Sequence, residues 1–230
     1  MRFPSIDIWE IEQLLSPSRC IICNRYASEL CLPCSPTPSP MRVRLPRAKQ
    51  PLLSSLIYDD HVAKIVLAAK EDNSRLAQFY LAKQISALVA HATHHIDVSS
   101  LLFISVPSTS RAITARGYVH MDRITRFLTS PLPIVRGAGV TLQSDKRVRD
   151  QSKVHSLQRS ANVQGGFSVR RGSMTEIAPD VGIILLDDVV TTGSSMRESI
   201  RALNTVGIEP DALISACISP RLASNRMVPS

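Results

Sequence analysis

Apolar residues recur at the spacing of an α-helix in several stretches of the chain. The pattern predicts amphipathic helices over residues 61–70 and 75–92, and further helices over residues 118–128 and 195–206. On the second of these, one side would carry a row of apolar side chains: Leu76, Tyr80, Leu81, Ile85 and Leu88.

Short, continuous apolar runs alternate with these helical stretches. They predict buried strands over residues 101–106, 182–186 and 212–218. Weaker strand candidates, residues 139–142 and 167–169, flank a long polar segment. Alternating strands and helices at this spacing are typical of an α/β fold with an open, mostly parallel sheet, as in Rossmann-like proteins.

Proline is concentrated at the start of the chain. Eight of the 15 prolines lie in residues 1–51, and residues 35–51 combine five prolines with four basic and no acidic residues. Such a stretch cannot form a helix or a central strand, and it predicts a semi-extended linker. We therefore expect three parts: an N-terminal helix with a cysteine knuckle (1–34), the linker (35–51) and an α/β domain (52–230).

Composition and charge narrow the class of protein. Hydrophobic residues at 44% and charged residues at 20% exclude a largely disordered or fibrous chain. The formal net charge of +8 favours anionic partners, either phosphorylated small molecules or nucleic acid. The sequence has neither the apolar run of about 18 residues that a membrane helix needs nor the layout of a signal peptide. We expect a cytoplasmic protein.

Four cysteines lie close together in two Cys-x-x-Cys pairs: Cys20 with Cys23, and Cys31 with Cys34. Two such pairs can close a tetrahedral Zn²⁺ site, which would be structural because no ligand position stays open. Asn24 follows the first pair, where a left-handed conformation is useful and Asn tolerates it. The alternatives are two disulfides, which the cytosol disfavours, or a redox-active Cys-x-x-Cys.

A run near the C-terminus combines acidic and hydroxyl side chains. An apolar stretch ends in Asp187 and Asp188, and the turn that opens the next helix follows: Thr191, Thr192, Gly193, Ser194 and Ser195. Backbone N–H groups at a helix start favour a phosphate, and ionised carboxylates accept hydrogen bonds from sugar hydroxyls. The run predicts a site for a ribose 5-phosphate. The alternative is a Rossmann-like strand end and a capping serine that serve the fold alone.

The same run resembles the signature with which type I phosphoribosyltransferases bind 5-phosphoribosyl 1-pyrophosphate (PRPP). In that signature, four apolar residues precede Asp-Asp, two apolar residues and Thr-Thr-Gly, and residues 183–193 match it without a gap. The chain also resembles the ComF family, which joins a cysteine knuckle to such a domain. Residues 65–70 and 116–118 resemble two of its motifs, and a third is matched by Arg149, Gln151, Arg159, Asn162, Val163, Gly165 and Phe167.

Two departures from the ComF pattern stand out. Val119 and His120 follow Arg116-Gly117-Tyr118 where the family usually has Asn-Gln. The segment after Pro107 lacks the usual His and second Arg. The resemblance therefore implies binding of PRPP more directly than transfer of its ribosyl group.

The resemblance also implies roles for individual residues. Asp187 and Asp188 would hold the ribose hydroxyls, and residues 191–195 would hold the 5-phosphate. A pyrophosphate bound with Mg²⁺ would meet Ser108, Thr109, Arg111, Arg116, Arg149, Gln151 and Arg159. Residues 105–159 contain ten basic residues and three aspartates, which suits a polyanion, although a solvated basic face is the alternative.

The implied function is PRPP binding with Mg²⁺, with transfer to an unknown acceptor in DNA uptake (competence) or in a nucleotide-related role. The first rival is a non-catalytic PRPP sensor or adaptor of the DNA uptake machinery. The second is a protein that binds single-stranded DNA and retains a vestigial pocket. No aromatic residue occurs between Tyr26 and Tyr58, so stacking platforms for bases are missing from the linker.

Overall fold

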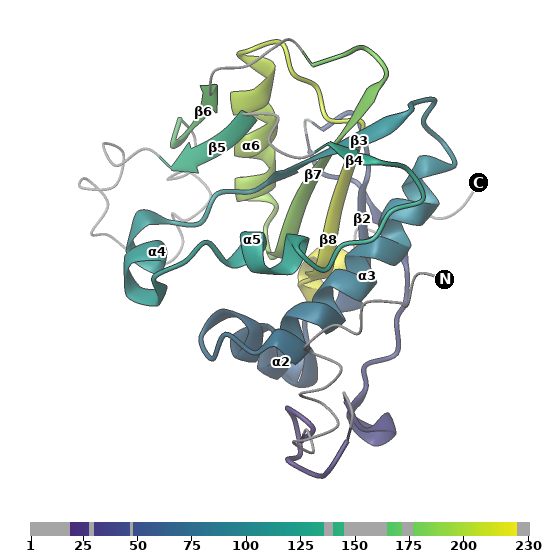
Figure 1. The fold of residues 1–230 in the computed structure, drawn as a ribbon, viewed down its shortest axis with the longest axis vertical. Coiled ribbons are helices and arrows are strands. Elements are labelled where there is room, and N and C mark those ends of the chain that lie inside the picture. The colour runs from purple at the N-terminus through teal and green to yellow at the C-terminus, as the bar shows by residue number, and fades with distance from the viewer. Residues whose placement is uncertain are drawn as a thin grey trace, which may run out of the picture.

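The protein is described by a computed structural model, shown in Figure 1. The structure describes residues 19–27, 30–46, 48–135, 140–144, 165–171 and 177–224. Among these residues, none of the helices has the length and apolar character that crossing a membrane requires.

A six-stranded sheet forms the centre of the molecule, in the order β1-β2-β8-β7-β3-β4. Its strands are β1 (Met41–Val43), β2 (Leu52–Ile57), β3 (Ser100–Ser105), β4 (Ile134–Val135), β7 (Val181–Val190) and β8 (Ala212–Ile218). β1 pairs with β2 antiparallel, and all other neighbours pair parallel. The predicted α/β class with a mostly parallel sheet is confirmed.

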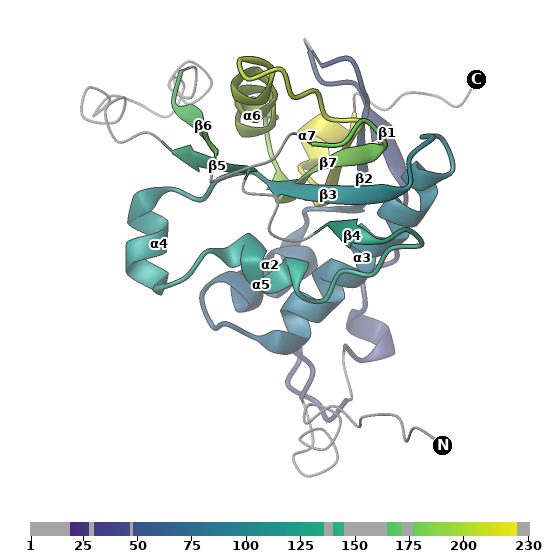
Figure 2. The same ribbon diagram turned by 45° about the horizontal axis from the view of Figure 1, so that its top comes forward.

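Helices cover both faces of this sheet (Figure 2). Helices α2 (Asp60–Lys70), α3 (Arg75–Thr93) and α5 (His120–Thr125) lie on one face, and α6 (Ser194–Asn204) lies on the other. Each face has its own apolar core. The helices over 61–70, 75–92 and 195–206 are confirmed within two residues at each end.

The predicted helix over 118–128 is wrong in its extent. Gly117 has a φ of 77° and ends a separate helix, α4 (Ser110–Arg116), and α5 then begins at His120. A left-handed glycine just past a helix is a common helix end. The predicted helix is therefore shortened to α5, and α4 is a helix that the apolar spacing does not predict.

The sequence pattern also misses β2, whose interior contains two serines. Ser54 and Ser55 are buried, but both are satisfied by hydrogen bonds. Ser55 Oγ donates to Gln84 Oε1 on α3 at 2.8 Å, and Ser215 Oγ donates to Ser54 Oγ at 3.3 Å. Pairs of buried hydroxyls and amides allow a polar-looking segment to lie inside a sheet.

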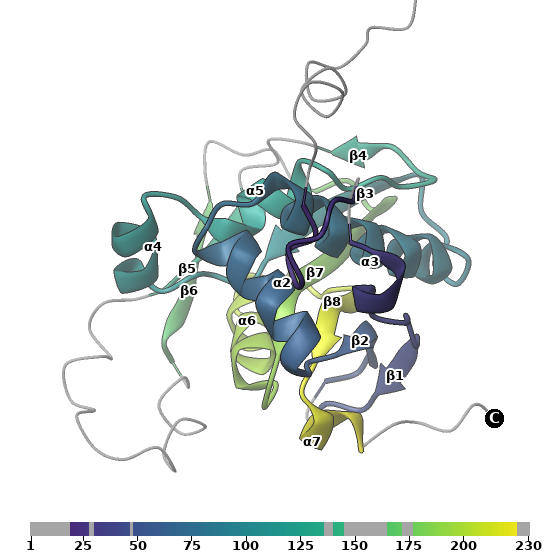
Figure 3. The same cartoon turned by 90° about the horizontal axis from the view of Figure 1, so that it is seen from below.

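The proline-rich stretch 35–51 packs against the sheet and is more than the predicted linker. It contributes β1 at the edge, with Val43 and Leu45 buried and Arg42 and Arg44 exposed. Seen from below (Figure 3), β1 lies beside β2 and the short helix α7 (Pro220–Ala223). An edge position is the one place in a sheet where a proline-rich stretch can pair.

A separate antiparallel pair, β5 (Val140–Ser144) and β6 (Phe167–Arg171), lies beside α6 (Figure 2). It corresponds to the two weaker strand candidates of the sequence. Buried Glu198 connects α6 to this strand pair, because Glu198 Oε1 accepts a hydrogen bond from Phe167 N at 3.3 Å. Arg201 donates to both Glu198 oxygens and to Phe167 O.

Candidate functional site

The parallel strands β3 and β7 bring two predicted segments to the same edge of the sheet. Ser105 pairs with Leu186, and Val106 N donates to Leu186 O at 2.8 Å. The loop after β3 and the acidic pair, which lies in the last part of β7, are therefore carried by neighbouring strands. In open α/β sheets, ligands bind at this carboxyl edge.

Asp188 is buried in a three-residue cluster. It is 4% exposed, and its Oδ2 lies 2.6 Å from Lys70 Nζ at the end of α2 and 3.1 Å from His120 Nε2 at the start of α5. Burial alone would raise the pKa of Asp188, but the Lys70 ammonium and the hydrogen bond from His120 outweigh it and hold that pKa below its usual value. Asp188 is therefore ionised at neutral pH.

Lys70 is stabilised in its charged form by the same contact. Burial would lower the pKa of its ammonium, but the nearby Asp188 carboxylate raises that pKa above its usual value. The cluster therefore contains an ion pair that is largely removed from water, with its lysine 27% exposed.

Asp187 has a different environment from its neighbour. It is half-buried, and its Oδ1 accepts a hydrogen bond from Asp188 N at 3.0 Å. Burial and the adjacent Asp188 charge raise the pKa of Asp187 well above its usual value. The two carboxylates are thus unequal: Asp188 is fixed and ionised, and Asp187 is more accessible and resists ionisation.

The turn after β7 forms the start of α6. Gly193 is the N-cap residue with a φ of 73°, and no side chain caps the helix. Ser194 N donates to Thr192 Oγ1 at 3.3 Å, and the next amides of the first helical turn are the ones that can donate to a ligand. Thr192 Oγ1 and Ser194 Oγ lie 2.9 Å apart, and Arg197 Nη2 donates to Ser194 Oγ at 3.1 Å. Thr191 and Thr192 are exposed, Gly193 and Ser194 are buried, and Ser195 is half-buried.

The predicted pyrophosphate residues after β3 have several different environments. Thr109 caps α4, since its Oγ1 accepts from Ala112 N at 3.1 Å, and Arg111 is exposed. Ser108 lines a cavity of about 840 Å³ that lies between β3, β4, α4, α5 and the β5–β6 pair. Arg116 is 3.4 Å from Glu71 at the end of α2, so the structure pairs this side chain with an acid.

Three predicted residues, Arg149, Gln151 and Arg159, lie outside the described residues. The acidic pair, the turn 191–195 and the loop after β3 lie at the same edge of the sheet, but neither the acidic pair nor the turn lines the cavity that Ser108 lines. It also adds Lys70 and His120, to which the sequence assigns no binding role. The only sequence signals for these two are a helix ending in Lys and a departure from a family motif at position 120.

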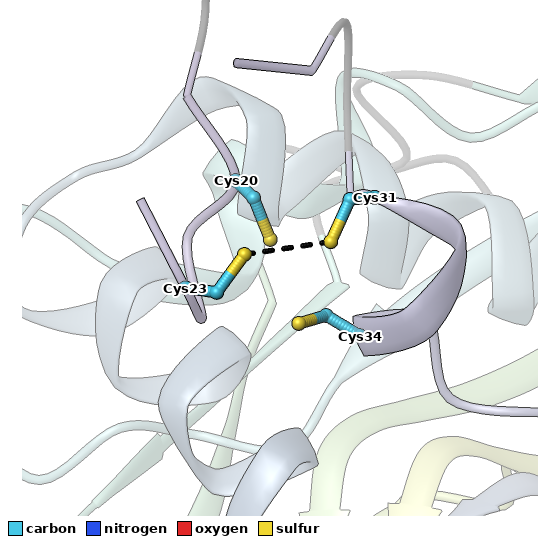
Figure 4. A group of neighbouring side chains, drawn as sticks. All are labelled: Cys20, Cys23, Cys31 and Cys34. Carbon is cyan, nitrogen blue, oxygen red and sulfur yellow. Dashed lines mark hydrogen bonds between the residues drawn. The ribbon is translucent and has the colours of Figure 1, made fainter. Parts of the chain in front are cut away.

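The four cysteines form a compact cluster of sulfurs (Figure 4). Their Sγ atoms all lie within 4.8 Å of one another, and Cys23 Sγ is 3.5 Å from Cys31 Sγ. A tetrahedral Zn²⁺ with Zn–S bonds of about 2.3 Å needs sulfurs about 3.8 Å apart, so the spacing fits this ion. None of the four is in a disulfide. Asn24 has the expected left-handed conformation, with a φ of 59°.

The thiols of the cluster differ in acidity. Burial would raise the pKa of Cys20, but hydrogen bonds from the backbone of Cys23 and Cys31 lower it to about 6. A hydrogen bond with Cys31, together with burial, raises the pKa of Cys34 to about 12. A metal ion would therefore meet one thiolate at neutral pH and would displace protons from other thiols.

Comparison with known proteins agrees with the geometry of this edge. Residues 112–228, about half of the chain, match the family described as phosphoribosyl transferase domain. The chain belongs to the phosphoribosyltransferase family. Its matched region begins in α4 and includes β7, the acidic pair and the turn before α6.

Individual relatives cover smaller parts of the chain. The orotate phosphoribosyltransferases of Bartonella bacilliformis and Caulobacter vibrioides are each 42% identical over 57 residues, which is 25% of this chain and 27% of theirs. The chain thus spans about a quarter of the length of the curated relatives it matches.

Solved phosphoribosyltransferases show weak structural likeness to this chain. A hypoxanthine-guanine phosphoribosyltransferase from Bacillus anthracis is 10% identical over 65% of this chain and 71% of its own, with a TM-score of 0.30. An APRTase from Giardia lamblia is 13% identical over 82% of this chain and 84% of its own, with a TM-score of 0.33. Scores this low support no conclusion about substrates.

Proposed function

We propose that this phosphoribosyltransferase domain binds PRPP together with Mg²⁺. The ribose hydroxyls would donate to Asp187 and Asp188, and the 5-phosphate would lie over residues 191–195. The observation that supports this most directly is the ionised Asp188 beside an uncapped helix start at one edge of the sheet. A ligand with hydroxyls at one end and a phosphate at the other suits that arrangement.

The pyrophosphate group would lie toward the loop after β3. Ser108 and Arg111 would meet it, and Thr109 would add its backbone because its hydroxyl already caps α4. Arg116 would have to leave Glu71 to reach a ligand. Arg149, Gln151 and Arg159 complete this proposed set by resemblance alone. Oxygen-rich pyrophosphate is the kind of ligand that Mg²⁺ prefers, and the ion would neutralise its charge.

If the ribosyl group is transferred, the bond between ribose C1 and pyrophosphate breaks and a bond from C1 to the acceptor forms. The part played by the protein would be positioning and electrostatic stabilisation. Asp188 would fix the ribose, and the basic residues would stabilise the leaving pyrophosphate. Binding without release of pyrophosphate would instead indicate a PRPP sensor.

Calorimetric titration with PRPP and Mg²⁺ tests the assignment. We expect the wild type to bind, and a double variant, Asp187→Asn with Asp188→Asn, to bind at least a hundredfold more weakly, since charged hydrogen bonds contribute about 1.5–3 kcal/mol each. No heat from the wild type, or equal heat from both proteins, would reject the pocket. Ribose 5-phosphate and inorganic pyrophosphate as separate titrants would show which half of the ligand each segment recognises.

We further propose that the cysteine cluster holds a structural Zn²⁺ through Cys20, Cys23, Cys31 and Cys34. The sulfur spacing supports this, as does the local fold: Cys20 N donates to Arg25 O at 2.7 Å, and Cys34 ends the 3₁₀ helix η1 (Leu32–Cys34). A cysteine cluster ahead of a phosphoribosyltransferase domain is also what the ComF family would show. Membership of that family, and a role in DNA uptake, rest on this arrangement and on the sequence motifs.

A further inference from the structure

His120 occupies an unusual position for a histidine. It is 2% exposed at the first position of α5, and its Nε2 lies 3.1 Å from Asp188 Oδ2. Asp188 is ionised and can only accept hydrogen bonds, so His120 Nε2 must carry the proton of this bond. Among the described residues, no group lies within hydrogen-bond distance of His120 Nδ1.

Both hydrogen bonds to the Asp188 side chain reach the same oxygen. Lys70 Nζ and His120 Nε2 both approach Oδ2, and neither of these two contacts involves Oδ1. Two donors from two different helices fix the rotation of a carboxylate far better than one donor does. They also leave Oδ1 outside both contacts, on the other side of the carboxylate from these two donors.

The segment just before His120, residues 116–118, forms side-chain contacts with the end of α2. Tyr118 Oη donates to Lys70 O at 2.7 Å, and Arg116 Nη1 lies 3.4 Å from Glu71 Oε1. Arg123 stacks over the Tyr118 ring at 5.2 Å. His120 therefore comes from a backbone that α2 holds in place, and its distance to Asp188 is set by these neighbouring contacts.

We propose that His120 is a positioning residue that orients Asp188 Oδ1 toward the ribose hydroxyl of the bound ligand. This inference rests on the proposed function, because the ligand is the PRPP assigned above. His120 does not touch the ligand. It acts through Asp188, and Lys70 supplies the second contact that keeps the carboxylate ionised and in one orientation.

The decisive comparison is between His120→Gln and His120→Met in the full chain. Gln and Met have nearly the same length, but only Gln offers an N–H in place of Nε2. In calorimetric titrations with PRPP and Mg²⁺, we expect the Gln variant to bind within about threefold of the wild type and the Met variant to bind about ten- to a hundredfold more weakly. His61→Leu, at an exposed histidine on α2, should bind like the wild type.

A spectroscopic readout tests the hydrogen bond without any ligand. In ¹H–¹⁵N spectra of the histidine rings, the His120 Nε2 proton should be protected from exchange in the wild type and lose that protection in Asp188→Leu, whose side chain has no acceptor. If the Met variant does not fold, this spectrum tests the inference: an Nε2 proton that already exchanges rapidly in the wild type, and whose exchange Asp188→Leu leaves unchanged, overturns it.

The remaining outcomes separate the two proposals. Wild-type affinity in the Met variant, or equal weakening in the Gln and Met variants, overturns the role of His120 and leaves PRPP binding intact. Absence of PRPP binding by the wild type overturns the proposed function and the positioning role together.

Discussion

Leu45 lies directly against Gly193: a Cβ atom built at position 193 would be 2.8 Å from Leu45 Cδ2. Gly193 also has a φ of 73°, which L-residues with a side chain rarely adopt. Leu45 belongs to the proline-rich stretch 35–51 and is 1% exposed. The turn proposed to hold the 5-phosphate is therefore supported by the segment that joins the cysteine cluster to the sheet.

Replacement of Gly193 by alanine should destabilise the fold through two separate causes. The left-handed φ costs about 1–2 kcal/mol, and the contact with Leu45 adds overpacking, for a total of about 2–4 kcal/mol. Chemical denaturation measures this difference. Gly207→Ala is the matched control, because Gly207 has a φ of 76° but nothing within 4 Å of its added Cβ. Equal losses in the two variants would show that Leu45 does not crowd the turn.

The two aspartates should respond to the same substitution with opposite signs. Asp187→Asn removes a carboxylate whose ionisation burial disfavours, so the free energy of unfolding should rise at neutral pH. Asp188→Asn leaves the Lys70 ammonium without its partner, so the free energy of unfolding should fall by about 2–4 kcal/mol. Both variants should lose PRPP affinity. Urea unfolding at pH 7 tests the contrast, and a fall in stability for both variants would contradict it.

The pH dependence of stability follows from the same two carboxyls. The pKa of Asp188 is below its ordinary value of 3.8. The ionised carboxylate therefore contributes fully to the free energy of unfolding above about pH 4, and this stabilisation is lost as the pH falls further. The pKa of Asp187 is raised, so its ionisation costs stability as the pH rises above 3.8. Urea midpoints measured from pH 3 upward should therefore decline less on acidification in Asp188→Asn than in the wild type.

Lys70 should be far more important for stability than an exposed lysine in a similar ion pair. Lys70→Met leaves the buried Asp188 with His120 alone, and we expect a loss of about 2–4 kcal/mol, somewhat below that of a fully buried pair because the Lys70 side chain is 27% exposed. Lys49 pairs with Glu209 at 2.8 Å, but its side chain is 77% exposed. Lys49→Met should therefore change the free energy of unfolding little. Similar losses in the two variants would contradict the buried cluster.

The sequence predicts the features of this fold that depend on residues close together in the chain. Residues 212–218 form a strand with the predicted bounds, since a continuous apolar run is buried on both faces. The acidic pair and the Thr-Thr-Gly turn can also be predicted from sequence, because both lie within eleven consecutive residues, 183–193. In contrast, Asp188 meets Lys70 and His120 across 118 and 68 positions of the chain, and apolar spacing contains no information on such contacts.

Secondary-structure elements that contain buried serines, or that end at a glycine, are the other features that the apolar pattern does not predict. Ser54 and Ser55 give the sequence of β2 a polar character that is typical of a loop. Only the structure shows that Gln84 and Ser215 form hydrogen bonds with these two buried serines. The apolar pattern does not predict α4, which ends at Gly117 through a left-handed backbone conformation. Stretch 35–51 contains the short strand β1 and a turn at Pro46, and the buried side chains of Val43 and Leu45 attach it to the sheet.

Removal of zinc should affect more than the cysteine knuckle. Ile21, Ile22 and Leu30 pack against the apolar core formed with α2 and α3, and Tyr80 Oη on α3 donates to Pro36 O at 3.1 Å. Purified protein should contain about one zinc ion per chain, and a strong chelator should lower the thermal midpoint and expose amides of α3 to hydrogen exchange. Cys23→Ser should remove the metal. Cys217→Ser is the control: this buried thiol lies in β8, outside the cluster, so the variant should keep its zinc. A wild-type protein without zinc, or one whose α3 exchange a chelator leaves unchanged, would show that the cluster does not stabilise this face through a metal.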